Sequence, residues 1–413
     1  MRGMPPSTTQ SHATTHVRGW RALELDASVV GIGAALALVS IGFDVASDGV
    51  FLTPRNLTNL AIQSSVVAIM ATGMVLVIAS RQIDLAVGSI VGVTGMLAAV
   101  MQAEWLPAEA AWGWPLALAA ALASGGLVGL WQGYWIAYRA VPAFIVTLAG
   151  LLVFRGLAYL VTDGRTVAPL HPSFEMLGGG IDGSIGAAAS WLLAALSLAA
   201  VAAATWRRRV DRHRHGFPAR PIWAETARLA LAAALILGFV AVMNAYTLPR
   251  SDVARGIPIP VLILLATALF VDQLARRTRF GRHAFAYGGD PDATELAGIQ
   301  VRRVLLGVFG LMGVLAGLAG VLTAARLGAG ANSMGTLAEL SVIAAAVIGG
   351  TSLRGGTGAV GGAVLGAVFM QSLENGMVLL GVSSALRQVC IGIVLLLAVW
   401  IDSATRARAE LAR

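Results

Sequence analysis

The chain of 413 residues alternates between long apolar runs and short polar stretches. A run of about 20 apolar residues, rising about 1.5 Å per residue, is long enough to cross the hydrocarbon layer of a membrane as a helix. The apolar segments lie near residues 28–47, 60–80, 84–102, 114–138, 141–161, 184–205, 222–246, 258–275, 304–325, 337–353, 358–380 and 386–402. This pattern predicts an all-α, polytopic integral membrane protein with about 10–12 transmembrane helices.

The predicted organisation is one transmembrane domain over residues 28–402 between two polar ends. Residues 1–27 are polar and rich in Ser and Thr, which predicts a disordered tail before an uncleaved first helix, in preference to a cleaved signal peptide. Residues 403–413 form a second short tail. Glycines between 349 and 358 interrupt the apolar run that includes 337–353, so the pattern leaves open whether that segment spans the membrane or re-enters it.

The amino-acid composition excludes several kinds of chemistry for this chain. Hydrophobic residues make up 57% of the chain, and its twenty-nine basic residues are all Arg, with no Lys. A Walker A motif and a Schiff base both require a Lys, so any ATP used with this protein must be hydrolysed by another chain. The one cysteine, Cys390, lies in an apolar run and excludes an intrachain disulfide. We therefore expect a non-enzyme with no catalytic residues, no metal site and no cofactor.

The charge distribution predicts how the chain sits in the membrane. A net charge of +8 could suggest nucleic acid, but the Arg residues alternate with spans and form no basic domain, so we predict no nucleic-acid partner. With the amino end inside, the inner loops hold Arg81, Arg139, Arg207, Arg208, Arg209, Arg212, Arg214, Arg220, Arg276, Arg277, Arg279, Arg282, Arg302, Arg303 and Arg354, whereas the outer loops hold few Arg. Because cytoplasmic loops retain Arg, we expect both termini in the cytoplasm.

Polar residues within apolar segments are costly in a membrane and are candidates for function. Those expected along a substrate pathway are Gln63, Asp84, Ser89, Gln132, Asn332, Glu339, Asn375 and Gln388. Asp84 could equally cap the helix that follows it. Arg155 must find an acid or backbone carbonyls, and a structural ion pair is the preferred interpretation. The glycines of 126–133 and 310–320 are interpreted as sites of close helix packing.

The longest inner loop, residues 276–303, has a pattern of its own. Asp290 can cap a helix, Pro291 suits its first position, Ala293 to Ala297 favour helix, and Gly298 ends it. The loop is either a segment that lies on the membrane surface or a docking element for a cytoplasmic partner, and the pattern supports both equally.

Four motifs resemble one known family in their order along the chain. They are residues 56–89, which contain QIDLAVGS; 142–156, PAFIVTLAGLLVFRG; 278–303, within the inner loop; and 339–367, followed by ENG at 374–376. Together they resemble the permeases of bacterial ABC sugar importers of the ribose and xylose type. A block over 165–250 with two extra spans is similar to the xylose permease branch. One departure is Leu-Ala-Gly at 148–150, where a Leu-Gly pair is more usual.

The resemblance implies a homodimer in the bacterial inner membrane that translocates a monosaccharide, D-xylose or another pentose. It implies a periplasmic sugar-binding protein outside and a cytoplasmic ABC ATPase inside, with membrane lipid around the spans. The ATPase would dock on Phe280, Gly281, Arg282, Gly288, Gly289, Asp290, Ala293, Ala297, Gly298 and Ile299.

The main alternative is an ion-coupled secondary sugar transporter, because twelve spans and a basic central loop also suit that class. Few acidic residues lie in the spans, which disfavours ion coupling. A membrane enzyme lacks a metal cluster or an evident nucleophile, and a channel would depend on the glycines at 349–358 alone.

Overall fold

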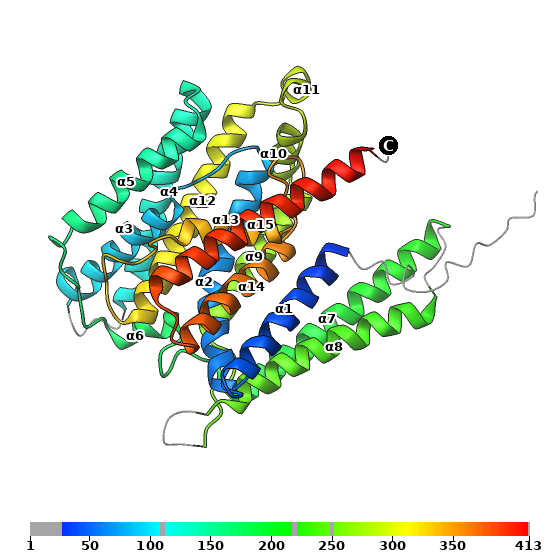
Figure 1. The fold of residues 1–413 in the computed structure, drawn as a ribbon, viewed down its shortest axis with the longest axis horizontal. Helices are drawn as coiled ribbons and strands as arrows, with labels where there is room; N and C mark the ends of the chain where they lie inside the picture. The colour runs from blue at the N-terminus through cyan, green and yellow to red at the C-terminus, as the bar shows by residue number, and fades with distance from the viewer. Residues whose placement is uncertain (1–26, 108–111, 217–220, 248–251, 412–413) are drawn as a thin grey trace, which may run out of the picture. The chain divides into compact units, whose positions relative to one another are not determined.

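The computed structural model describes residues 27–107, 112–216, 221–247 and 252–411, so the tail predicted for 1–27 lies outside it except for Ala27. Within these residues, the elements in chain order are α1 (Ala27–Ala46), α2 (Pro54–Ala79), α3 (Val87–Val100), η2 (Met101–Trp105), α4 (Gly113–Arg139), α5 (Ala143–Leu160), α6 (Pro172–Glu175), η3 (Met176–Gly178), α7 (Gly186–Arg214), α8 (Ile222–Ala245), α9 (Ile259–Arg277), α10 (Arg279–Gly289), α11 (Pro291–Leu296), α12 (Val301–Leu327), α13 (Ala338–Ile348), α14 (Val360–Leu379) and α15 (Ser384–Leu411). Figure 1 shows these helices and no strand in the described part of the chain.

The predicted fold class is confirmed: ten helices of the described chain are long and apolar enough to cross a membrane. The ends of the helices depend on capping residues and prolines, and they differ from the ends of the apolar runs. The second helix begins at Pro54, ahead of the apolar run, because the Thr53 hydroxyl accepts the Asn56 amide and Pro54 suits the first turn. The carboxyl-terminal helix continues from the last apolar segment through the predicted tail to Leu411.

Helix α13 is a half-length element. It has 11 residues, about half of what a membrane crossing requires. The chain after Ile348 leaves the helical conformation, and Gly350, Gly355 and Gly356 have φ angles of 90°, 84° and 77° in the connection to α14. Because side chains rarely adopt such φ angles, these glycines are where the apolar run is broken.

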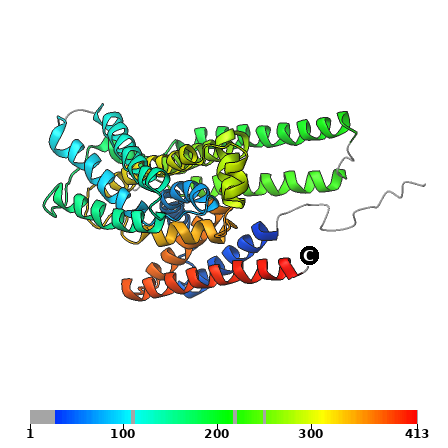
Figure 2. The same cartoon turned by 90° about the horizontal axis from the view of Figure 1, so that it is seen from above.

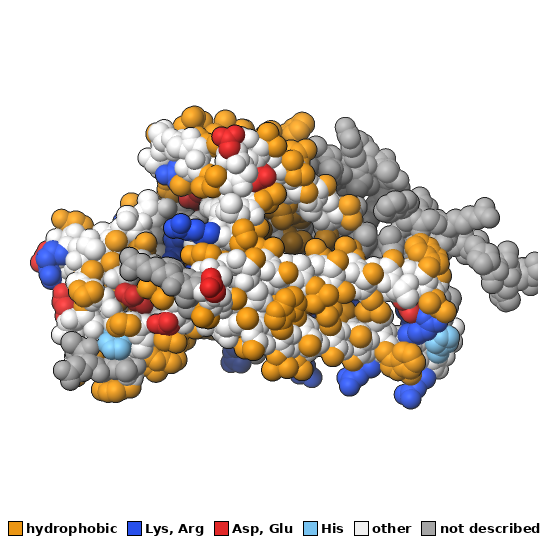
Figure 3. Space-filling view, turned by 90° about the horizontal axis from the view of Figure 1, so that it is seen from below, with side chains coloured by type: hydrophobic (Ala, Val, Ile, Leu, Met, Phe, Trp, Pro, Cys, Tyr) orange, Lys and Arg blue, Asp and Glu red, His pale blue; other side chains and the backbone are white. Residues whose placement is uncertain are grey.

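Contacts divide the chain into two units, which are described separately. The larger comprises Ala27–Leu193 and Phe239–Arg413. Within the described residues, the smaller comprises the parts of α7 and α8 between Ala194 and Gly238. There, an ion pair joins Arg209 of α7 to Glu225 of α8. Figure 3 shows Arg and His side chains gathered at the end of this hairpin, where α7 carries Arg212, His213 and Arg214 in its last turn.

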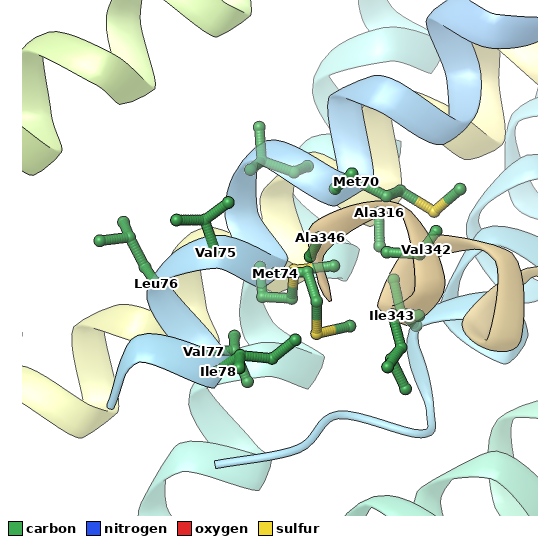
Figure 4. Packing of buried hydrophobic residues seen from close by; sticks show 14 of the residues in the cluster. Met70, Met74, Val75, Leu76, Val77, Ile78, Ala316, Val342, Ile343 and Ala346 are labelled. Atoms are coloured by element: carbon green, nitrogen blue, oxygen red, sulfur yellow. The ribbon is translucent and has the colours of Figure 1, made fainter. Parts of the chain in front are cut away.

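The core of the large unit is built around three central helices. Buried positions make up 83% of the most apolar stretch of α2, 78% of that of α3 with η2 and 72% of that of α12, but 6% of that of α1. Figure 4 shows side chains of α2, including Met70 and Met74, against Ala316 of α12 and Val342 and Ile343 of α13. The peripheral helices expose mainly apolar side chains, which suits contact with lipid (Figure 3).

Glycines bring α4 and α12 into backbone contact, as predicted. A Cβ atom at Gly129 would lie 2.2 Å from the Phe309 carbonyl oxygen, and one at Gly313 would lie 2.1 Å from the Gly125 carbonyl oxygen. No side chain fits at these positions, so α4 packs tightly on the central helix.

Candidate functional site

A polar pocket of about 360 Å³ lies among the central helices of the large unit. It is formed by α2, α3, α12, the segment before α13, α13 itself, α14 and α15. Its polar lining residues are Gln63, Thr323, Arg326, Ser333, Thr336, Ser341, Gln371, Glu374, Ser384, Arg387 and Gln388. Arg326 is in the last turn of α12, whose first turn follows α11, so the pocket lies toward the end of α12 away from α10 and α11.

The lining mixes hydrogen-bonding groups with two kinds of charge. The Gln371 amide donates to the Glu374 carboxylate at 2.9 Å, and Arg326 interacts electrostatically with the same carboxylate. Hydroxyls and amides can exchange bonds with a neutral polyhydroxylated molecule, and the apolar side chains between them limit how tightly it is held. This arrangement suits passage of a sugar better than chemistry on it.

The pocket contains two of the predicted pathway residues, Gln63 of α2 and Gln388 of α15. Helical geometry explains why the others are elsewhere, since a polar residue in a span can face a neighbouring helix instead of a cavity. Asn375 is one turn from the pocket residue Gln371, yet its Oδ1 accepts from the Asn56 amide at 2.9 Å and so ties α14 to α2. Gln132 of α4 is fully buried with its Nε2 atom beside Gly150 of α5.

A second group of predicted residues lies where α3 and α13 begin. Asp84 is fully buried in the break between α2 and α3, and its Oδ1 accepts the Ala86 amide at 2.8 Å, so it supports the start of α3. Its Oδ2 has no hydrogen-bond partner among the described residues. The Ser89 hydroxyl donates to the Leu151 carbonyl of α5 at 2.8 Å. The Oδ1 bond fits the capping interpretation of Asp84, and its role in the substrate pathway stays a prediction.

Glu339, Asn332 and Arg155 belong to the same region. A Cβ atom at Gly88 of α3 would lie 2.3 Å from Glu339 Oε2, so the first turns of α3 and α13 are in contact. Arg155 of α5 donates from Nη1 to the backbone carbonyls of Asn332 at 3.1 Å and Met334 at 2.8 Å. The hydrogen bonds of Arg155 thus go to carbonyls, one of the two kinds of partner expected, and Glu339 interacts with it electrostatically without a salt bridge between the two side chains.

The loop at 276–303 contains two helices, one of which was predicted. Helix α11 begins as expected: Asp290 Oδ1 accepts the Ala293 amide at 3.0 Å, Pro291 is the first helical residue, and Gly298 follows with a φ of 78°. Helix α10 was not predicted, because its glycines obscure a helical pattern. The Thr278 hydroxyl caps it by accepting the Gly281 amide at 3.3 Å.

The predicted docking residues divide by exposure. Phe280, Gly281 and Gly288 face the core, with Phe280 beside Gly307 of α12, and Ile299 is half-buried. The exposed members are Arg282, Gly289, Asp290, Ala293, Ala297 and Gly298. The inward set fixes the loop on the spans, and the outward set is available to another molecule.

Sequence reasoning missed two features at this end of the unit. Leu296, the last residue of α11, is 89% exposed, which is unusual for a leucine on a polar loop. Beside it, Tyr138 of α4, Glu295 and residues 299–303 line a concave surface of about 460 Å³. The available signal was an apolar residue directly after Glu295 in a polar inner loop.

Comparison with known proteins shows to which protein family this chain belongs. Residues 56–399 match the family described as branched-chain amino acid transport system / permease component. The chain belongs to this permease family, and the ten apolar helices of its described residues fit a multi-pass protein of the inner membrane.

Its relatives narrow the comparison. The chain is 42% identical over 375 residues to the xylose transport system permease protein of Escherichia coli K12, with 91% of each chain covered. It is 41% identical to the xylose permease protein of Haemophilus influenzae Rd, covering 91% of this chain and 96% of the relative. The ribose import permease protein of Escherichia coli K12 is 33% identical, covering 90% and 92%. No solved structure matches. The predicted resemblance to sugar permeases of the ribose and xylose type is therefore confirmed.

Proposed function

We propose that this chain is the membrane permease of an ABC importer for a pentose, with D-xylose the leading candidate. A periplasmic binding protein delivers the sugar, and a separate ATPase supplies the energy because this chain has no Lys for a Walker A motif. The observation that carries the proposal is the 42% identity to a xylose permease over 91% of both chains, against 33% to a ribose permease.

The orientation is part of the proposal. Arg81, Arg277, Arg282, Arg303 and others gather at the end of the large unit that holds α10 and α11. Arg-rich loops remain in the cytoplasm, which supports placing α10 and α11 inside and the polar pocket toward the periplasm.

In this orientation the two ends of the large unit have separate roles. The pocket containing Gln63, Glu374 and Gln388 receives sugar from the outside. The ATPase contacts the exposed face of α10 and α11, where Leu296 is the apolar anchor and the neighbouring concave surface supplies Glu295 and Arg302. Two copies of the chain assemble in lipid with the pathway along or near their interface.

Reconstitution tests the proposal. The permease, its ATPase and its binding protein are placed in vesicles, and uptake of labelled xylose is measured with and without ATP. ATP-dependent accumulation that needs all three components is the expected result. Accumulation by the permease alone, driven by a proton or sodium gradient, would establish the ion-coupled alternative instead.

Two controls refine the test. Ribose and a branched-chain amino acid are offered in parallel, because the family description includes amino acid transport. The stoichiometry is measured by native mass spectrometry of the assembled complex, and one permease per complex would contradict the proposed homodimer.

A further inference from the structure

One arginine joins three segments at the α10 end of the large unit. Arg81 follows α2 and has a left-handed φ of 58°. Its Nε donates to the Gly288 carbonyl at 2.7 Å and to the Arg354 carbonyl at 3.0 Å, and its Nη2 donates to the Gly289 carbonyl at 2.8 Å. Gly288 and Gly289 end α10, and Arg354 belongs to the connection between α13 and α14.

The chemistry of these acceptors explains the choice of arginine. The last carbonyls of a helix have no partner within the helix and carry partial negative charge. A guanidinium group presents several donors in a fixed plane, so it can bond carbonyls of two segments at once, whereas an ammonium group is a single point of charge.

The same three segments also meet through their backbones. The Gly356 amide donates to the carbonyl of Ala79, the last residue of α2, at 2.9 Å. A Cβ atom at Gly288 would lie 1.6 Å from that Ala79 carbonyl oxygen and 2.8 Å from the Gly356 nitrogen. Figures 1 and 2 show α10 lying against this end of α2. With no space between them, α10 cannot shift without displacing α2 or the connection.

Both helices that leave this junction reach the polar pocket. Helix α2 carries Gln63 and Met70 in the pocket lining, and α14, which follows the connection, carries Gln371 and Glu374. The junction also begins the break before α3, where the Ile83 carbonyl accepts the Thr147 hydroxyl of α5 at 3.2 Å. A displacement of α10 at the junction therefore moves α2 and α14, and both of these helices carry residues that line the pocket.

We propose that Arg81 is a positioning residue that couples movement of α10 to α2 and α14, and so couples ATP hydrolysis to opening of the pocket. The inference rests on the proposed function, because it requires a motor that moves α10. Arg81 itself contacts neither sugar nor nucleotide; it keeps the segment that meets the ATPase and the helices that line the pocket moving together.

The backbone conformation at Arg81 allows a substitution that removes the side chain without straining the backbone. Its φ of 58° is strained for most side chains and is favourable for glycine, so Arg81→Gly removes the guanidinium while relaxing the backbone. Arg81 is exposed, and its three bonds contribute modestly to folding, so the variant is expected to fold. The matched control is Arg139→Gln, because Arg139 ends α4 and stacks over the Tyr134 ring without bonding α10.

The experiment measures three quantities in reconstituted complexes: co-purification of the ATPase, ATP hydrolysis without sugar, and sugar imported per ATP hydrolysed. For Arg81→Gly, ATPase co-purification and ATP hydrolysis without sugar are expected to stay within about twofold of wild type. The sugar imported per ATP is expected to fall about tenfold, within the usual range for coupling between sites. Arg139→Gln should match wild type in all three, and Arg81→Lys should lie between.

The outcomes separate this inference from the proposed function. If wild type imports no sugar with ATP, the proposed function is wrong whatever the variants do. If wild type imports sugar and Arg81→Gly does so equally well per ATP, Arg81 does not couple the segments. Loss of ATPase binding in Arg81→Gly also overturns the inference, because Arg81 would then maintain the docking surface itself. Should Arg81→Gly fail to fold, Arg81→Lys decides: a wild-type ratio refutes coupling, and a severalfold loss supports it.

Discussion

The sharpest prediction concerns two adjacent glycines at the end of α10. Gly288→Ala and Gly289→Ala each add one methyl group to neighbouring residues of one helix. At Gly288 that methyl would lie 1.6 Å from the Ala79 carbonyl oxygen, a backbone atom that cannot rotate away. At Gly289 it meets nothing within 4 Å. The two substitutions have the same chemistry and opposite surroundings.

The structure sets the size of the effect. Moving the contact at Gly288 from 1.6 Å to an ordinary 3.4 Å requires α10 and α2 to separate by about 1.8 Å. The Arg81 bond to the Gly288 carbonyl, now 2.7 Å, would then exceed hydrogen-bonding distance. Overpacking costs about 1–3 kcal/mol in well-packed sites, whereas an exposed change is usually within about 0.5 kcal/mol.

The assay follows thermal unfolding in detergent together with sugar imported per ATP in vesicles. Gly288→Ala should lower the unfolding midpoint by several degrees, by roughly 2–4 °C per kcal/mol for a large domain, and reduce the import ratio about tenfold. Gly289→Ala should leave the unfolding midpoint unchanged, because its added methyl group meets no neighbouring atom. Equal behaviour of the two variants would show that α10 is not held against α2 in the way described.

Three further predictions test other parts of the structure. Leu296→Asp should abolish co-purification of the ATPase while leaving the unfolding midpoint within about 1 °C, because the side chain has few contacts to lose. Glu374→Gln should reduce sugar uptake without changing ATP hydrolysis in the absence of sugar, measured on the same vesicles, since the residue lines the pocket and not the docking surface. Gly129→Val should prevent recovery of monodisperse protein in size-exclusion chromatography, whereas Gly156→Val, with nothing within 4 Å of its Cβ position, should be recovered normally.

Hydropathy located the spans because a membrane imposes length and apolarity on every crossing helix. It could not decide that α13 is half-length, since 337–353 is mostly apolar and its helix ends through glycine conformations at Gly350 and beyond. Nor did it indicate α10, whose sequence RFGRHAFAYGG contains three glycines, which disfavour a helix. Tertiary contact with α2 and α12 compensates for that weak propensity.

The candidate pathway was harder to predict than the fold for a geometric reason. A polar residue in a span has a definite cost but no definite direction until its helix is placed. Gln63 and Gln388 turned toward the pocket, while Asn375 turned toward Asn56. Arg326 and Glu374 also line the pocket but were not selected; Arg326 lies in the last turn of its helix, where a charged residue resembles a solvated terminus in sequence.

Arg81 illustrates the same limit more strongly. In sequence it counts as one more positive charge near an inner helix end, and the rule that keeps arginines in the cytoplasm explains its side of the membrane. That rule depends on the positive charge alone, so it holds for any orientation of the side chain. The observed guanidinium is directed at three backbone carbonyls of two other segments, and its own backbone adopts a conformation that few side chains tolerate. A charge needed only for topology would not require bonds to three carbonyls of two other segments, so the geometry favours a mechanical role in joining α10 to the pocket helices.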